Sequence, residues 1–287
     1  MSIFSEVGSD SLGSELDTKL IKLIGERFIA RKDVKAIERN DGAWNPVTDT
    51  GKADGKRLPF SVKDFQDHFT GKRTLGHYLV APDNTCKLFA FDIDLDKDGW
   101  WIDTTEGKDD GDLASLLKDG IKCNPRSVWA AQDPPEAVAY FTTTLRGLAD
   151  GLAAATHRLF GGDVHVAIAN SGGKGLHVYG FTGSMPAADV REYARAVLME
   201  FGGIFEPQRG DNFWKHTAQG AYRNLTIEIF PKQDNLDGKD LGNLMRLPLG
   251  VNRKTGRRGH FITSNASYAR LVEMDPMRVL TGDLPWE

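Results

Sequence analysis

The chain has 287 residues, of which 40% are hydrophobic and 26% are charged, with two cysteines and a formal net charge of −4. This is the composition of an ordinary globular protein, and two isolated cysteines disfavour a disulfide framework or a cysteine-based zinc site. No apolar run reaches the roughly 20 residues that cross a bilayer, and the N-terminus lacks the pattern of a signal peptide. We therefore expect a cytoplasmic monomer that makes no membrane contact.

The first half of the chain predicts two helices and two strands. Apolar residues recur with helical spacing over residues 14–30, and Ser61 begins a second helix with the sequence VKDFQDHF. Strand-like runs at residues 77–81 and 87–95 are joined by a Pro-Asp-Asn turn. A long polar stretch follows at residues 96–125, a length that is uncommon in compact domains unless the loop is functional.

The second half alternates between the two kinds of element. A helix is predicted at residues 134–160, then strands at 164–169 and 176–181 around a glycine-rich turn, a helix at 187–201, and a strand at 225–230 that a proline ends. Hairpin-like strand pairs among helices indicate an α+β fold with a small antiparallel sheet, rather than a regular β-α-β winding.

The charge is unevenly distributed. Residues 92–119 carry ten acids and three lysines, a net of −7, so removing them from the total of −4 leaves the rest of the chain at +3. A mildly basic body permits a nucleic-acid partner without requiring one.

The first motif is a pair of acids in residues 88–94 (LFAFDID). Because side chains on a strand alternate between faces, Asp92 and Asp94 lie on one face and the aromatic residues on the other. Two neighbouring carboxylates repel each other unless a cation lies between them, and Mg²⁺ or Mn²⁺ prefers carboxylate oxygens. The alternatives are a strand end with exposed acids, or a calcium loop starting at Asp94, although position twelve of that loop is Thr105 instead of Glu.

The second motif is the glycine-rich turn at residues 170–177 (NSGGKGLH). Its glycines let the backbone approach a ligand and direct N–H groups at an anion, while its serine, lysine and histidine add further donors. The turn differs from a P-loop because no Ser or Thr follows the lysine and no helix begins there. The alternative is a glycine-rich hairpin with a surface histidine. The candidate phosphate-binding residues are Ser171, Gly172, Gly173, Lys174, Gly175 and His177.

A third acid, Glu228, lies in the apolar strand 225–230 (LTIEIF) and points away from its aliphatic neighbours. An acid in such a strand is unfavourable unless it is paired or binds a metal, and Lys232 follows at the strand end. The alternative is the exposed face of an edge strand. Arg246 stands alone among apolar residues at 242–250 (GNLMRLPLG), where an arginine needs a carboxylate or phosphate partner.

A basic loop follows Arg246 and is the candidate contact for a nucleic-acid backbone. The alternative is a solvated turn. Its cations are Arg253, Lys254, Arg257 and Arg258.

Together and in this order, the motifs resemble the archaeo-eukaryotic primase superfamily. The string SGGKGLHV is also similar to one in the polymerase domain of bacterial repair ligases. The phrase EIFPKQD, followed by GNLMRLPLG and RKTG, more closely resembles primases of CRISPR-associated and related mobile-element conflict systems. The resemblance covers roughly residues 75–262, and the first 70 residues contribute little to it.

The resemblance implies an α+β primase-polymerase core in a single domain of residues 1–287. An N-terminal α/β module at about residues 14–160 would interlock with a sheet module like an RNA-recognition motif at about 161–265, followed by a tail at 266–287. Asp92, Asp94 and Glu228 would hold two Mg²⁺ or Mn²⁺ ions. The incoming nucleotide would be held by Ser171, Gly172, Gly173, Lys174, Gly175, His177, Lys232 and Arg246, and DNA by Arg253, Lys254, Arg257 and Arg258.

The implied activity is a DNA-dependent primase-polymerase that adds NTPs or dNTPs to a primer, or starts a primer, by two-metal nucleotidyl transfer. Its partners would be a DNA template and primer, with a helicase, a ligase or CRISPR adaptation proteins as candidates in trans, and replication or repair as its setting. Two alternative hypotheses are a catalytically silent nucleic-acid-binding module and a metal-dependent nuclease. The third acid is Glu where many relatives have Asp, and the acidic stretch 96–119 has no counterpart that we can use.

Overall fold

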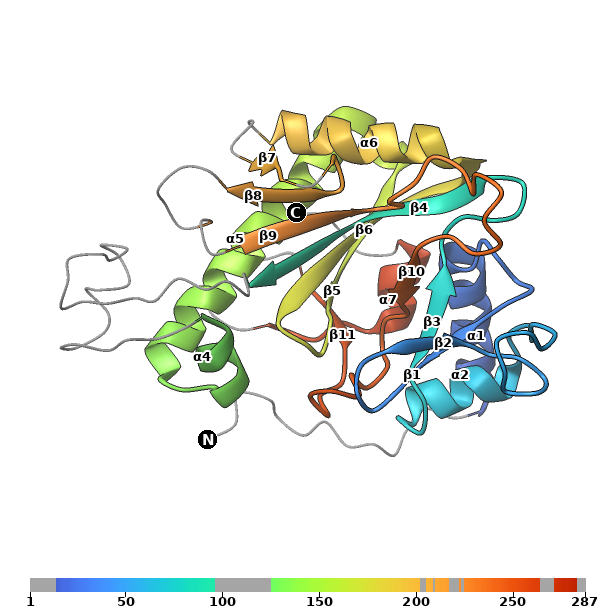
Figure 1. Cartoon of the computed structure of the whole chain (residues 1–287). Coiled ribbons are helices and arrows are strands. Elements are labelled where there is room, and N and C mark those ends of the chain that lie inside the picture. Colours follow the sequence, from blue (N-terminus) through green and yellow to red (C-terminus); the bar gives the residue numbers. More distant parts are fainter. Residues whose placement is uncertain are drawn as a thin grey trace.

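The computed structural model describes residues 14–95, 125–201, 205–208, 210–216, 222, 225–263 and 271–282. Within these ranges the chain forms two antiparallel sheets with helices packed around them, which is an α+β arrangement (Figure 1). The acidic stretch 96–119 lies outside the described residues.

The helices agree with most of the predicted segments. Ser61 caps its helix with a capping box, since its hydroxyl oxygen accepts from the Asp64 amide and the Asp64 carboxylate accepts from the Ser61 amide. No described helix combines the length and the apolar character that crossing a membrane requires. The helices are α1 (Ser14–Phe28), α2 (Val62–Phe69), α4 (Pro125–Ala131), α5 (Pro135–Phe160), the 3-10 helix η1 (Gly161–Asp163), α6 (Ala187–Glu200) and α7 (Pro276–Thr281). Three short helices among the described residues, α4, η1 and α7, were not predicted, and α7 lies in the predicted tail.

The smaller sheet has four strands in the order β10-β3-β1-β2. The strand predicted at residues 77–81 is shifted in the structure, because the chain leaves the ladder after Tyr78, and the Leu79 amide then donates to the Asn243 carbonyl. Residues 79–81 stay buried without strand pairing, so their apolar character reflects burial alone. The strands are β1 (Ala36–Glu38), β2 (Trp44–Pro46), β3 (Leu75–Tyr78) and β10 (Leu244–Arg246).

The larger sheet has seven strands in the order β11-β5-β6-β4-β9-β8-β7. Its centre is formed by β4, which pairs along most of its length with β6 on one side and with β9 on the other. The predicted strand at 176–181 is longer in the structure, because pairing with β4 continues through the polar segment up to Pro186. The strands are β4 (Thr85–Leu95), β5 (His165–Asn170), β6 (Gly175–Pro186), β7 (Phe205–Pro207), β8 (Phe213–His216), β9 (Leu225–Phe230) and β11 (His260–Ile262).

The two faces of the larger sheet are covered differently. Helices α5 and α6 contact its central strands, and Phe91 and Ile93 on β4 are fully buried (Figure 1). On the opposite face, Phe28 of α1 makes edge-on ring contacts with Tyr179 and Phe181, both at 5.0 Å between centroids. Only part of that second face is covered, and the polar residues of the central strands lie on the remainder.

Each sheet takes strands from both sides of residue 160, where the two interlocked modules were predicted to divide. Strand β4 precedes that point and lies at the centre of the larger sheet, whereas β10 follows it and pairs with β3 in the smaller one. The two sheets are therefore built from both halves of the chain.

Candidate active site

The three predicted metal-binding acids lie on the same face of the central strands. Asp92 on β4 lies directly opposite Glu228 on β9 and directly opposite His177 on β6. Directly opposed residues in antiparallel strands share a face, with Cβ atoms about 4.5–5.5 Å apart. Asp94, two residues further along β4, lies on the same face. Residues far apart in the chain thus converge on one surface.

Each acid contacts one basic side chain from a neighbouring strand end or turn. All three carboxylates stay accessible, with side-chain exposures of 26% for Asp92, 27% for Asp94 and 36% for Glu228. The pairs are Asp94 with Lys174, Asp92 Oδ1 with His177 Nε2 at 3.4 Å, and Glu228 Oε2 with Lys232 Nζ at 2.8 Å.

The glycine-rich turn is closed by its own hydrogen bonds. The Gly172 amide donates to Asn170 Oδ1 at 2.8 Å, and the Gly173 amide donates to Ser171 Oγ at 3.1 Å. Gly172 has φ +67°, and a Cβ there would lie 2.5 Å from the Arg257 carbonyl oxygen, so the turn requires glycine at this position. Two of the backbone donors expected to face an anion are therefore already satisfied within the turn.

Side chains from three other elements hold the carbonyls of this turn. The Trp129 indole on α4 donates to the Gly173 carbonyl at 2.8 Å, and the Thr255 hydroxyl donates to the Gly172 carbonyl at 2.5 Å. Arg246 Nη1 on β10 donates to the Ser171 carbonyl at 3.1 Å. Sequence reasoning did not assign Trp129 or Thr255 to the site, because neither residue type signals a contact with a distant turn.

A buried tyrosine orients His177. The Tyr179 hydroxyl lies 2.8 Å from His177 Nδ1, and Tyr179 is fully buried. Burial raises the pKa of Tyr179, so its phenol keeps its proton. Among the described residues this nitrogen is the only hydrogen-bond partner of the phenol, so Nδ1 accepts from the phenol and Nε2 is the ring nitrogen that faces Asp92. His177 thus directs an N–H donor at the acidic face.

The sequence matches the family model described as the Archaeo-Eukaryotic Primase domain of the TOTE conflict system, over residues 19–273. The chain belongs to this family. No curated protein sequence matches it. The match confirms the resemblance to archaeo-eukaryotic primases of conflict systems, and it extends further toward the N-terminus than we expected, into α1 and the smaller sheet. Membership implies nucleotidyl transfer with nucleotide and nucleic-acid substrates, a chemistry for which divalent metals are typical.

The two strand-borne aspartates of this primase domain have pKa values shifted in opposite directions. Burial and the charge of Asp92 raise the pKa of Asp94 to about 6, although Lys174 opposes the shift. Burial also acts to raise the pKa of Asp92, but the adjacent His177 and the more distant Lys174 outweigh it, so the pKa is lowered. A divalent cation placed between them would favour the ionised form of both.

The donor set of the primase domain fits a hard divalent ion. Within the described ranges, no three His, Cys, Asp or Glu side chains lie close enough to form a ready-made metal cluster. The accessible carboxylates of Asp92, Asp94 and Glu228 are nevertheless the oxygen ligands that Mg²⁺ and Mn²⁺ prefer, and they lie on adjoining strands. Each would exchange its basic partner for the ion.

Arg246 has the carboxylate partner that its apolar surroundings require. Its guanidinium contacts both oxygens of Glu38 on β1, with Nε 3.2 Å from Oε2, and it lies over the Trp44 ring at 5.7 Å. Glu38 is almost fully buried. The two residues are 208 positions apart, so no local pattern could identify this pair. A direct contact between Arg246 and a phosphate remains a prediction.

The arginines of the basic loop are partly engaged in backbone contacts. Arg253 donates to the Gly71 carbonyl at 2.9 Å, and Arg258 donates to the Phe69 carbonyl at 2.6 Å. Arg257 Nη1 reaches the Trp129 carbonyl at 3.5 Å, and burial lowers the pKa of both Arg257 and Arg258. The loop is therefore a docked segment in which Lys254 is exposed.

Proposed function

We propose that this primase domain joins nucleotides on a DNA template by two-metal nucleotidyl transfer, either extending a primer or starting one. The observation that carries the proposal is the strand register that sets Glu228 opposite Asp92 while Asp94 shares their face. A third acid pointing elsewhere would leave only a pair of carboxylates. The adjoining turn adds the cation and the N–H donor that a triphosphate needs.

Asp92, Asp94 and Glu228 would hold the two ions, which when bound supply Lewis-acid charge for the attacking hydroxyl and the departing pyrophosphate. The protein's own contribution is positioning. Lys174 brings an ammonium group, and His177 an N–H donor, to the same face, where phosphate oxygens can replace their carboxylate partners.

The other predicted nucleotide-binding residues divide by position. Lys232, at the end of β9 beside Glu228, is a second cation available to the polyphosphate. Ser171, Gly172, Gly173 and Gly175 shape the turn that presents Lys174, and Arg246 braces that turn through the Ser171 carbonyl.

The test is incorporation of a labelled nucleotide on a primed DNA template with Mn²⁺ or Mg²⁺. Glu228→Gln keeps the size of the side chain and removes its charge, so incorporation is expected to fall by at least about 10²-fold, the loss typical of a missing transition-state contact. The matched control is Glu26→Gln, an exposed acid on α1 whose partner is Lys22. Full activity in the Glu228 variant would overturn the metal-site assignment.

Two further arms separate the competing functions. Labelled DNA incubated with metal and no nucleotide should stay intact, and cleavage that depends on Glu228 would establish a nuclease instead. DNA binding without incorporation under any metal and nucleotide condition would establish a silent binding module. An unprimed template, supplied with ribonucleotides and then with deoxyribonucleotides, distinguishes initiation from extension.

A further inference from the structure

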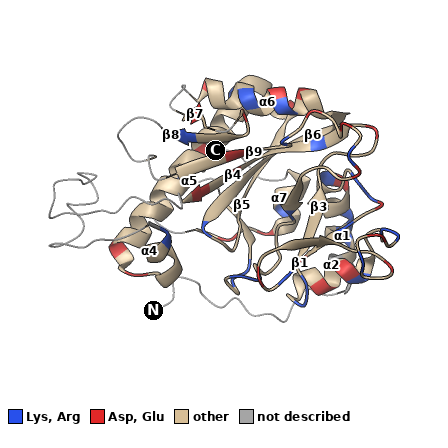
Figure 2. Cartoon of the chain, viewed as in Figure 1, with Lys and Arg blue, Asp and Glu red and all other residues tan. Residues whose placement is uncertain are grey.

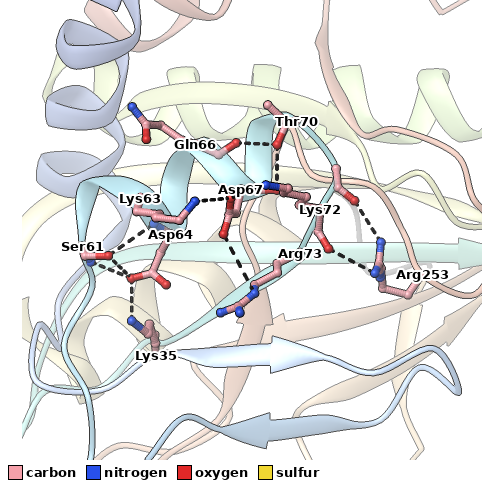
Figure 3. A network of polar contacts seen from close by, with 11 residues as sticks. Lys35, Ser61, Lys63, Asp64, Gln66, Asp67, Thr70, Lys72, Arg73 and Arg253 are labelled. Atoms are coloured by element: carbon pink, nitrogen blue, oxygen red, sulfur yellow. Dashed lines mark hydrogen bonds and ion pairs between the residues drawn. The ribbon is translucent and has the colours of Figure 1, made fainter.

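Three basic side chains surround one carboxylate at the end of α2. Asp67 is only 11% exposed and contacts Lys63 at 3.1 Å, Lys72 at 3.9 Å and Arg73 at 4.0 Å (Figure 3). The three cations are open to solvent, with side-chain exposures of 73%, 72% and 53% respectively. One carboxylate cannot neutralise three cations, so this turn keeps an excess of positive charge.

The basic loop docks on the same turn. Arg253 donates to the carbonyls of Gly71 and Lys72, at 2.9 and 3.2 Å (Figure 3). Arg258 donates to the Phe69 carbonyl at the C-terminus of α2. Segments that are about 180 residues apart in the chain therefore join their cations into one surface. Figure 2 shows Lys and Arg segments around α2 and in the adjacent loop.

The same loop also reaches the candidate active site. Thr255 donates to the Gly172 carbonyl in the glycine-rich turn, while Arg253, two residues earlier, contacts the end of α2. The loop thus bridges the turn that carries Lys174 and the cluster around Asp67. The basic loop therefore lies between the candidate active site and the basic side chains at the end of α2.

We propose that this surface binds the sugar-phosphate backbone of the nucleic-acid strand that runs through the active site. This surface, the cationic turn, consists of Lys63, Lys72, Arg73, Arg253, Lys254 and Arg258. The assignment adds the α2 end to the predicted DNA contacts of the loop, and it rests on the proposed function for the identity of the strand.

Helix capping accounts for only part of the arrangement. Arg253 and Arg258 donate to carbonyls at and just after the end of α2, as cations near a helix C-terminus commonly do. Lys63, Lys72 and Arg73 make no such contact, and an exposed ion pair adds only about 0–1 kcal/mol of stability. In a chain of net charge −4, an exposed positive cluster that the basic loop connects to the candidate active site favours a polyanionic partner.

The experiment measures DNA affinity by fluorescence anisotropy over a series of salt concentrations, for a labelled single strand and for a primed duplex. The test protein carries Lys63→Gln, Lys72→Gln and Arg73→Gln. A second version adds Asp67→Asn, so that no buried carboxylate loses all its partners. Each phosphate contact adds about 0.7 to the slope of log affinity against log salt on a single strand, and about 0.9 on a duplex.

Loss of three contacts should lower this slope by about 2 on a single strand or about 3 on a duplex, with roughly tenfold weaker binding at low salt. The form of DNA whose slope falls by its full expected amount is the form that lies on the surface. The control carries Lys22→Gln, Arg158→Gln and Lys239→Gln, which change net charge equally at exposed positions away from the cationic turn, and its slope should equal that of the parent protein.

An unchanged slope in both folded test proteins would overturn the proposal, and so would an equal loss in the control, which would indicate nonspecific charge attraction. The assay needs neither metal nor nucleotide, so it separates this inference from the proposed activity. Glu228→Gln should lack incorporation and still show the parental salt slope. If the Glu228 variant stays active while the cationic-turn variants lose DNA binding, the surface stands and the metal-site assignment fails.

Discussion

Gly175 is the position at which one added methyl group should disturb the candidate site most directly. It begins β6 immediately after Lys174 and pairs with Asp94 on β4. A Cβ at this position would lie 1.9 Å from the Ile93 carbonyl oxygen and 2.6 Å from Asp94 Oδ1. The obstacle is backbone, which no side-chain rotation can move away. Gly175→Ala can therefore be accommodated only if β6 and β4 move apart.

The expected cost follows from this geometry. Overpacking in a closely packed region typically lowers the free energy of unfolding by about 1–3 kcal/mol. The same displacement moves Lys174 and Asp94 relative to each other, and a shift of about 1 Å at a reacting centre can reduce the rate by about 10²-fold. We therefore expect nucleotide incorporation to fall more than the loss of stability alone would produce.

Urea unfolding and nucleotide incorporation on a primed template measure the two effects separately. Gly25→Ala on α1 is the matched control, because nothing lies within 4 Å of a Cβ at that position. Alanine is favoured over glycine inside a helix, so the control should gain up to about 1 kcal/mol and keep its activity. A Gly175→Ala protein with parental stability and incorporation would refute the argument that β6 needs glycine to approach β4.

Two further predictions concern pH. Because the pKa of Asp94 is raised to about 6, its carboxyl takes up a proton as the pH falls below that value, and Mn²⁺ affinity measured by calorimetry should then drop by about tenfold per pH unit. Asp94→Asn should abolish this dependence, and a flat parental profile would contradict the assignment. Burial lowers the pKa of His68 to about 4, and its Nδ1 accepts from the Leu75 amide. The unfolded chain binds this proton below about pH 6.5 whereas the folded chain resists it until about pH 4, so stability should fall as the pH drops through this window, by about 2 kcal/mol at pH 5. Urea unfolding at pH 7 and pH 5 measures this loss of stability. In the His68→Gln protein the loss between the two pH values should be smaller by about 2 kcal/mol. An equal loss in the parent and in the variant would exclude His68 as its source.

The strand faces of the candidate site residues were accessible from sequence because they depend on local periodicity. Alternation along β4 and β9 predicted the faces of Asp92, Asp94 and Glu228, and the strand register then placed Glu228 opposite Asp92. The shift of β3 to Leu75–Tyr78 was not predictable from alternation, because residues 79–81 are apolar for burial alone. The hydrogen bonds inside the glycine-rich turn were likewise missed, since composition does not show which donors a turn uses itself.

Contacts between distant segments could not be predicted. Arg246 was expected to need an anion, but only the folded chain brings Glu38 to it, because β1 and β10 both flank β3 in the smaller sheet. The docking of the basic loop on the turn after α2 was equally hidden, since Arg253 reaches that turn from a segment about 180 residues away.

The linear sequence alone predicted which residues would carry the chemistry and determined which face of its strand each one occupies, because side-chain alternation is a property of neighbouring residues. The tertiary structure decided which strands adjoin, which basic side chain meets each acid, and how the basic loop joins the end of α2 to the glycine-rich turn. These are matters of strand order and docking, which depend on burying apolar surface between segments remote in the chain.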